Sequence, residues 1–480
     1  MPDEKGGEKD PREDVGIMRR FRAVAPTTRT VSIRAFGGTD GSVGRNAGGF
    51  SYADLCENFD PSDGELKSAK GFAPLSQSFA FGERKASAVY FYKRTDAATG
   101  RDDRLVFFCD DGFLYDAPVA GGSLRKISGM TFSVPPNGIR YRYNGEDVML
   151  FSRGSEGLWI YDGTAATRVE DAPPVSSMCI HYERLFATDE SGECLWFSDD
   201  FDPSNWSVSL DEAGFIMMNG PRGDLLKVVS FFDYLYVFRS YGITRVTAYA
   251  EQTKFSVSDL YVSSGKIDGG SIVTCGDRIL YCSSDGFYRF DGVSAGRILK
   301  GLDDKIDFSS PVEGKFYDGK AYFTVFLKEN GKKYFLVYDP KSEEHYFVSA
   351  EECVDYELID GETIYDLYLL TGAGNVLYHP EGLTFFGAEK PRRWISKEGA
   401  FSLLAKKKCL KKIAFCLKGG VTVKVKADGT EKTYEKNENG KVAVLHPGVT
   451  ADEFRISFEG TGEIEISGLT LTFSYYDGTA

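Results

Sequence analysis

The densest group of potential cation ligands lies at residues 198–206, SDDFDPSNW. Together with Asp211 just beyond this stretch, its oxygen-bearing side chains match four positions of a calcium-binding loop. Asp200, Asp202, Ser204 and Asp211 take the first, third, fifth and twelfth positions. The sixth position is Asn205, where that loop needs glycine for its bend, and the twelfth is normally a bidentate glutamate. We therefore interpret the segment as a surface loop in which the aspartates cap turns and Trp206 packs against a strand edge.

Carboxylate pairs are the other source of catalytic chemistry, because glycoside hydrolysis needs two acids that only the fold brings together. Nominal candidates are Asp110, Asp111 and Asp199, but among 71 acidic residues some pair always looks suitable. The four histidines are too far apart in sequence, from each other and from cysteine, for a zinc motif. The sequence contains neither a glycine-rich phosphate loop nor a nucleophile elbow. We predict a non-enzymatic protein without metal or cofactor.

Basic residues gather at three places: Arg19, Arg20 and Arg22; Arg392 and Arg393; and Lys406, Lys407, Lys408, Lys411 and Lys412. The lysine cluster has two interpretations. It is either a solvated strand edge that lysines protect from pairing, or an electrostatic contact with an acidic partner subunit or with passing nucleic acid. All ten residues are candidate partner or assembly contacts.

Composition indicates which elements position these residues. Of 480 residues, 42% are hydrophobic and 27% charged, which is typical of a globular protein. With 36 Phe, 27 Tyr and 53 Gly, the chain favours strands and tight turns over helices. The net charge of −14 argues against a general nucleic-acid binder. Residues 387–480 carry 16 Lys/Arg against 12 Asp/Glu, so the balance there is +4 and the preceding residues hold −18.

The nine cysteines are scattered and never form a Cys-x-x-Cys pair. Several lie in apolar runs, so we predict buried, reduced thiols in a protein assembled in a cytoplasm. The first ten residues, MPDEKGGEKD, lack the apolar core of a signal peptide, and no run reaches the roughly 18 apolar residues of a spanning helix. We expect no membrane span.

A repeat runs from about residue 74, in which an aromatic-rich strand ends in Asp and a turn. Equivalent positions are Asp116, Asp162, Asp199, Thr247, Asp291, Asp339 and His379. Their mean spacing is near 44 residues, the length of one four-stranded propeller blade. Eleven Asp-Gly and five Asn-Gly dipeptides supply the tight hairpin turns. The fold class is therefore all-β, a six- or seven-bladed β-propeller followed by a C-terminal antiparallel β-sandwich.

The predicted organisation has four parts. Residues 1–16 form a charged, disordered arm, and residues 17–73 an extended segment that packs on the propeller or on the C-terminal platform. Residues 74–388 form the propeller. In residues 389–480, apolar and polar residues alternate with period two, as in half-buried strands of a small sandwich.

Several short stretches between residues 50 and 480 resemble the tail hub, nozzle and packaged-DNA stabilisation propellers of short-tailed bacteriophages. They include NFD at 58–60, GELK at 64–67, KGF at 70–72, RLFA at 184–187, LWFS at 195–198, DPSNW at 202–206, YLYVF at 234–238, GIT at 242–244, SG at 264–265 and LYC at 280–282. The charged N-terminal arm has no counterpart in that pattern.

The resemblance implies a structural virion protein that forms a homo-oligomeric ring, typically of six copies, below the portal and adaptor. Its partners are then other tail proteins and, transiently, packaged or ejecting DNA. An acidic lumen formed by the −18 part of the chain would let DNA slide through by repulsion. The alternatives are a monomeric carbohydrate- or protein-binding propeller and, less favoured, a propeller glycoside hydrolase.

Overall fold

The computed structural model of this chain describes residues 25–40, 51–96, 100–210, 213–249, 251–401 and 407–476. The predicted arm 1–16, the three arginines Arg19, Arg20 and Arg22, and Lys406 lie outside these residues. The described chain is built of strands, with three single-turn 3-10 helices: η1 (Val208–Leu210), η2 (Gln252–Lys254) and η3 (Gly269–Ser271). No helix in the described ranges is long and apolar enough to span a bilayer.

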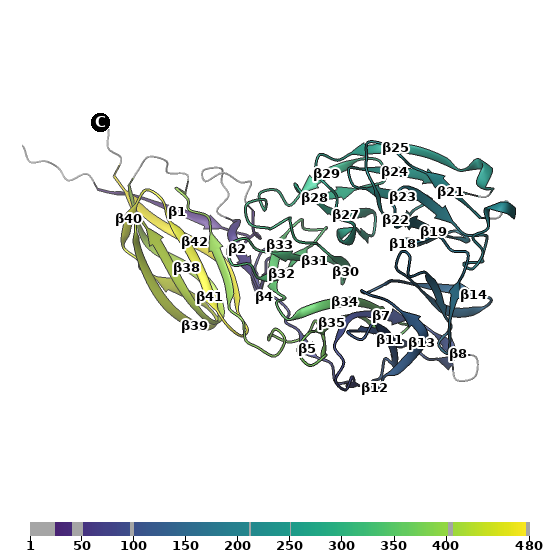
Figure 1. Cartoon of the computed structure of the whole chain (residues 1–480). Coiled ribbons are helices and arrows are strands. Elements are labelled where there is room, and N and C mark those ends of the chain that lie inside the picture. The colour runs from purple at the N-terminus through teal and green to yellow at the C-terminus, as the bar shows by residue number, and fades with distance from the viewer. Residues whose placement is uncertain are drawn as a thin grey trace, which may run out of the picture.

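Seven four-stranded antiparallel units follow one another around a ring (Figure 1). Six are separate sheets and one, blade 6, continues into a larger sheet. Blade 1 is β7 (Ala86–Tyr92), β10 (Arg104–Cys109), β11 (Phe113–Pro118) and β13 (Arg125–Thr131). Blade 2 is β14 (Asn137–Tyr143), β15 (Glu146–Ser152), β16 (Leu158–Tyr161) and β17 (Ala166–Val169). Blade 3 is β18 (Val175–His181), β19 (Arg184–Asp189), β20 (Cys194–Phe197) and β21 (Gly214–Met217).

The second half of the ring repeats this plan. Blade 4 is β22 (Leu225–Phe231), β23 (Tyr234–Arg239), β24 (Gly242–Thr247) and β25 (Ser256–Val262). Blade 5 is β26 (Val273–Cys275), β27 (Arg278–Ser283), β28 (Gly286–Phe290) and β29 (Ala295–Ile298). Blade 6 is β30 (Gly314–Tyr317), β31 (Lys320–Phe326), β32 (Lys333–Tyr338) and β33 (His345–Ser349). Blade 7 holds β34 (Cys353–Asp360), β35 (Tyr365–Thr371) and β36 (Leu377–His379).

The predicted repeat agrees with this architecture. Its seven equivalent positions all fall in the third strand of a blade or within two residues after it, from Asp116 in β11 to His379 at the end of β36. Buried aromatic residues fill the spaces between blades, as with Tyr236 of blade 4 and Phe290 of blade 5, whose ring centroids are 5.1 Å apart. The all-β propeller class is therefore confirmed.

The N-terminal part of the chain closes the ring. Strand β5 (Ala73–Pro74) pairs antiparallel with β36 and is the outermost strand of blade 7, with Pro74 opposite Tyr378. Just before it, the amide of Gly71 donates to the carbonyl of Gly382 at 2.9 Å. Four further short strands precede blade 1 or lie in the connections between its strands: β6 (Phe79–Ala80), β8 (Thr95–Asp96), β9 (Gly100–Arg101) and β12 (Gly122–Ser123).

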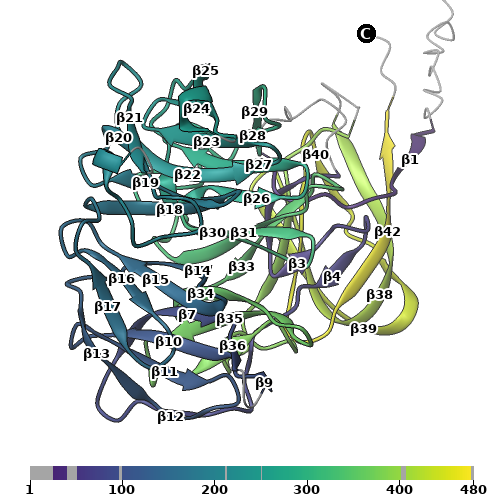
Figure 2. The ribbon, with the colours of Figure 1, turned by 90° about the vertical axis from the view of Figure 1, so that its right-hand side faces the viewer.

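The C-terminal part is a large antiparallel sheet that joins blade 6. Its strands are β37 (Arg392–Ser396), β38 (Lys408–Ala427), β39 (Thr430–Leu445), β40 (Val449–Ala451), β41 (Arg455–Gly460) and β42 (Glu465–Tyr475). N-terminal strands complete it: β1 (Thr27–Ile33) and β4 (Leu66–Ser68) pair with β42, β3 (Phe59–Asp60) pairs with β4, and β2 (Ala53–Glu57) pairs with β37. Figure 2 shows this sheet standing beside the propeller.

One residue pair carries the hydrogen-bonded sheet from the C-terminal part into the propeller: Glu57 of β2 lies parallel to Phe347 of β33. The next residue, Asn58, is buried and has a positive φ of 56°. Its side chain accepts from the Ser349 amide at 2.9 Å and donates to the carbonyl of Pro391 at 2.8 Å. The segment between residues 51 and 74 therefore contacts both the propeller and the large C-terminal sheet, which we call the platform.

Gly419 marks the point where β38 changes partner. Residues 408–418 of β38 pair with β42, and residues 422–426 pair with β41. Gly419 has a φ of 96°, and a Cβ placed on it would lie 2.1 Å from the carbonyl oxygen of Glu463. Glycine is therefore the residue that this close backbone approach allows.

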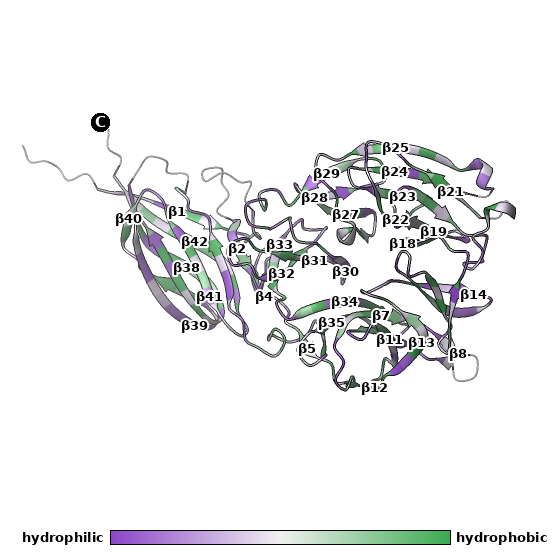
Figure 3. Cartoon of the chain, in the orientation of Figure 1, coloured by the Kyte–Doolittle hydropathy of each residue, from purple (hydrophilic) through white to green (hydrophobic). Residues whose placement is uncertain are grey.

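Side-chain alternation explains why the large sheet encloses a core. Figure 3 shows apolar and polar residues alternating along β38, β41 and β42. The apolar members pack into one cluster with the propeller residues Phe335 and Val337 and with the N-terminal Phe36. Trp394 is central to it: its ring lies 5.1 Å from that of Phe36, and its Nε1 donates to the carbonyl of Gly37 at 3.1 Å. All nine cysteines are free thiols, and six of them are buried.

Candidate interaction surfaces

Exposed apolar side chains are concentrated on blades 3 and 4. Among the described residues, ten of the nineteen exposed large hydrophobic side chains lie between positions 182 and 262. Four stand on the outermost strands: Phe215 (45% exposed) and Met217 (59%) on β21, and Val257 (47%) and Val262 (65%) on β25. We call these four the blade 3–4 surface. This grouping of exposed apolar side chains makes the surface a candidate interaction site.

A groove of about 1010 Å³ runs between the two outer strands. Its apolar lining includes Phe197, Phe215, Ile216, Phe255 and Val257. Phe197 and Phe255 are 5.2 Å apart at their ring centroids, so a residue after η2 packs across onto blade 3. Residues of both blades therefore form the groove.

The charged lining of this groove is mainly acidic: Glu183, Asp200 and Glu251, against Arg184. Arg184 and Asp200 form an ion pair of 2.7 Å. Burial raises the pKa of Asp200, and the positive charge of Arg184 opposes that shift. The surface thus combines an apolar centre with a polar rim, the usual anatomy of a protein–protein interface.

Strands β21 and β25 are also open edges. Among the described residues, β21 pairs only with β20, and β25 only with β24. Proteins usually protect such edges with charge or proline. Strand β21 exposes Phe and Met instead, and β25 exposes two valines beside the charged Asp259, which pairs with Arg222 at 2.5 Å. The sequence reasoning missed this surface. The signal was present as apolar residues at alternate positions of β21, which alternation alone assigns to a buried face.

The Asp-rich segment next to this groove is a turn structure. Asp202 accepts from the amide of Ser204 at 2.9 Å, and Asp199 accepts from the amide of Asp200 at 2.7 Å. Trp206 is buried, and its Nε1 donates to the carbonyl of Pro203 at 2.9 Å. These contacts confirm the interpretation of turn-capping aspartates and a packed tryptophan. Asp211 lies outside the described residues, and no group of three metal-ligating side chains occurs among the residues described.

The nominal hydrolase carboxylates lie in two different blades. Asp110 and Asp111 are in the turn between β10 and β11 of blade 1, whereas Asp199 follows β20 of blade 3. Asp110 accepts from the amide of Lys85 at 3.1 Å, and Asp111 accepts from the hydroxyl of Tyr115 at 2.5 Å. Asp110 and Asp111 therefore make hydrogen bonds within blade 1 and with the residue directly before it.

The predicted basic contacts separate into surface and interior residues. Lys407, Lys411 and Lys412 are exposed at the start of β38. Lys408 is fully buried, and its Nζ donates to the carbonyl of Asp452. Arg392 is buried too, donates to the carbonyl of Leu383 at 2.9 Å, and has a pKa that burial lowers. Lys408 and Arg392 are therefore not available at the surface of this chain, because their side chains pack inside it.

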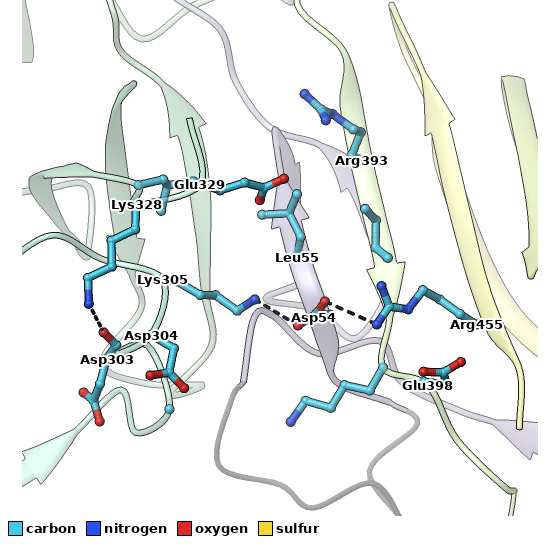
Figure 4. Close-up of a pocket in the computed structure, with 14 residues that line it drawn as sticks. Asp54, Leu55, Asp303, Asp304, Lys305, Lys328, Glu329, Arg393, Glu398 and Arg455 are labelled. Atoms are coloured by element: carbon cyan, nitrogen blue, oxygen red, sulfur yellow. Dashed lines mark hydrogen bonds and ion pairs between the residues drawn. The ribbon is translucent and has the colours of Figure 1, made fainter. Parts of the chain in front are cut away.

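Arg393 lies in a cleft of about 830 Å³ between propeller and platform (Figure 4). There Asp54 of β2 accepts from Lys305 at 2.9 Å and faces Arg455 of β41 at 3.8 Å. Arg393 itself forms an ion pair of 3.0 Å with Glu57. Five acidic and five basic residues line the cleft, so their charges balance. Of these ion pairs, the one between Lys305 and Asp54 joins the propeller to the platform.

His345 is the first residue of β33 in blade 6. It is 6% exposed, and within the described part of the chain neither ring nitrogen has a hydrogen-bond partner. Its carbonyl oxygen accepts from the amide of Thr39 at 3.2 Å. Burial lowers the pKa of His345 to about 4, although the negative charge of Asp40 opposes the shift.

We expect the stability of the fold to fall as the pH drops from 6.5 towards 4, because the unfolded chain then binds a proton that folded His345 does not. The loss attributable to this residue is about 3 kcal/mol. Urea unfolding at pH 7 and at pH 4.5 measures it. His345→Phe should flatten the dependence, while His446→Phe, at an exposed position, should leave it unchanged. The same change in unfolding free energy between pH 7 and pH 4.5 in both variants would contradict this account.

Comparison with other proteins yields similarity of overall structure at low sequence identity. No family model and no curated protein matches the sequence. A chain from the crystal structure of BBS1N in complex with ARL6DN, soaked with mercury, is 12% identical with a TM-score of 0.42, over 66% of this chain and 97% of that chain. The extracellular domain of the putative one component system BT4673 from B. thetaiotaomicron is 10% identical with a TM-score of 0.43, over 82% of this chain and 61% of that chain. At these values neither structure bears on what this chain binds.

Proposed function

We propose that this protein is a structural tail subunit of a short-tailed bacteriophage, a hub or nozzle protein that forms a ring below the portal and adaptor. It is assembled in the host cytoplasm and resides in the virion. The resemblance of its short motifs to that family motivates the proposal. The observation that carries it is the blade 3–4 surface, because a protein that exposes this much apolar strand surface needs a protein partner.

A second copy of the chain is the partner that fits best. The groove beside the blade 3–4 surface is mainly acidic, whereas the platform exposes Lys407, Lys411 and Lys412. Blades 3 and 4 and the platform lie at opposite ends of the molecule (Figure 1). Contact between two different surfaces is heterologous, and such contacts form a ring when the rotation between successive copies closes. Six copies, as in the family that the motifs resemble, would form the ring, and DNA would pass through its lumen.

Light-scattering mass and negative-stain imaging of the full chain, alone and mixed with a portal complex, test the proposal. We expect a ring near six times the chain mass of 53.1 kDa. The double variant Phe215→Asp with Met217→Asp should abolish it, because it places charge at the apolar centre of the interface. Val293→Asp is the control, since Val293 is an exposed apolar residue (73%) that lies between β28 and β29 of blade 5.

Charge reversal supplies an independent test of the other half of the contact. Lys407→Glu with Lys411→Glu should weaken the ring, and the effect should shrink at high salt because exposed charges are screened. A monomer under every condition, with and without the portal complex, would overturn the proposal.

A further inference from the structure

The first strands of the blades enclose a cavity of about 400 Å³ at the centre of the propeller. Residues of β7, β14, β18, β22, β30 and β34 line it, with Gly270 of η3 in the place of blade 5. Its volume is within the range of small-molecule sites. This channel cavity has two chemically different walls.

Blades 1 to 3 supply an uncharged wall. It contains Val89, Pro136, Ile139 and Met178. Tyr90 also lies there, and its hydroxyl donates to the carbonyl of Pro136 at 2.6 Å. An apolar group can pack against this side without leaving a charge unpaired.

Blades 4, 6 and 7 supply a charged wall: Lys227, Glu313, Lys315, Asp355 and Glu357. Lys315 and Glu357 form an ion pair of 2.5 Å. Asp355 accepts from the amide of Val89 at 2.7 Å through one carboxylate oxygen. Among the described residues, no ion pair includes Lys227. The Nζ of Lys227 donates to the carbonyl of Ile272 at 3.0 Å, which leaves two of its three N–H donors for another acceptor.

This arrangement leaves an unmatched positive charge on one blade and unmatched negative charge on others. Lys227 is on blade 4, and Asp355 is on blade 7, three blades away around the ring. Burying unpaired charges is costly, so a ligand that carries the opposite charges is stabilised here. We propose that the channel cavity binds a small zwitterion with an apolar side chain, such as a free amino acid. Its carboxylate accepts from Lys227, its ammonium group contacts Asp355 and Glu313, and its side chain packs against the uncharged wall.

The pKa shifts of Lys227 and Asp355 agree with these roles in binding a carboxylate and an ammonium group. Burial lowers the pKa of Lys227 to about 8, and the charge of Lys315 lowers it further, while Asp268 and Glu313 oppose the shift. Burial raises the pKa of Asp355 to about 7, with Lys315 opposing and Glu313 and Glu357 adding to the rise. Binding needs charged Lys227 and ionised Asp355, so affinity should be greatest between about pH 7 and 8 and fall on both sides.

Isothermal titration calorimetry of the full chain with L-leucine at pH 7.5 tests the inference. Leucinamide lacks the carboxylate and 4-methylpentanoate lacks the amine, so each should bind at least tenfold more weakly, since one hydrogen bond to a charged group is lost. Equal affinities for all three probes, or no binding of leucine, would overturn the proposal.

Two variants assign the binding to the cavity. Lys227→Met should weaken leucine binding at least tenfold and leave the already weak leucinamide binding unchanged, because that probe has no carboxylate to lose. Lys333→Met is the matched control, since the Nζ of Lys333 also donates to a backbone carbonyl, that of Cys353 at 2.8 Å, but does not line the cavity. Thermal melts confirm that both variants are folded. Equal leucine affinity in the two would contradict the assignment, whatever the oligomeric state of the protein.

Discussion

Replacing Asp116 with alanine is expected to lower the free energy of unfolding by about 3–5 kcal/mol, because it leaves partly buried arginine charges without their partner. Asp116 is fully buried in β11 and accepts from Arg104 and from Arg125, the latter at 2.9 Å. Arg125 also donates to the hydroxyl of Tyr161, at 2.8 Å, on blade 2. The carboxylate therefore holds an arginine that joins two blades.

Asp162 provides the matched control, because it occupies the same repeat position in blade 2. Its side chain caps a turn, accepting from the amides of Thr164 and Ala165 at 2.7 and 2.8 Å. Asp162→Ala should therefore cost only about 1 kcal/mol. Urea unfolding at neutral pH followed by tryptophan fluorescence compares the two. Equal losses would show that the Asp116 cluster does not link the blades energetically.

The second large effect is expected at Gly419, where alanine should cost roughly 3 kcal/mol or more. Two penalties combine: the positive φ disfavours any side chain, and the new Cβ would meet the carbonyl of Glu463, a backbone atom that cannot rotate away. The strain falls where β38 passes from β42 to β41, so the pairing of the whole platform is affected.

Gly429→Ala separates the two penalties. Gly429 has a φ of 78°, but a Cβ there meets nothing within 4 Å. We expect this variant to lose about 1–2 kcal/mol, the conformational term alone. Thermal unfolding of both variants measures the difference. If Gly419→Ala is no worse than Gly429→Ala, the close approach to Glu463 contributes nothing to the choice of glycine.

The propeller could be predicted from sequence because its signal is local and recurs. The residue at or just after the end of the third strand, such as Asp162 or Asp291, recurs at spacings of 37 to 48 residues, and aromatic residues precede it. Turn dipeptides reinforce the same pattern: Asp428-Gly429 forms the hairpin between β38 and β39, and both residues have positive φ.

The connections between the parts could not be predicted, because they join residues far apart in the chain. Pairing of Pro74 with Tyr378, or of Glu57 with Phe347, leaves no local pattern. The lysine cluster shows a related limit. Lys407 and Lys408 are equivalent by composition, but alternation along β38 turns one outward and buries the other.

The channel residues illustrate why candidate sites are harder to predict than folds. Lys227, Lys315 and Asp355 belong to three different blades, and each looks like an ordinary charge on a short strand. They converge only because the first strand of each blade faces the centre. A search for charged residues at matching positions of successive first strands could have found them.

The closing strand β5 has a consequence for how the protein is made. The ribosome synthesises β5 about 300 residues before its partner β36, a delay of about 15–60 s at elongation rates of roughly 5–20 residues per second. During that interval blades 1 to 6 can form while the ring is still open. The unpaired strands at its open edge can then pair with other nascent chains. The last blade is therefore completed by a strand made before any other strand of the seven blades, so the ring can close only after β36 has been synthesised. Slowing translation before residue 377 should prolong this vulnerable period, and speeding it should shorten it.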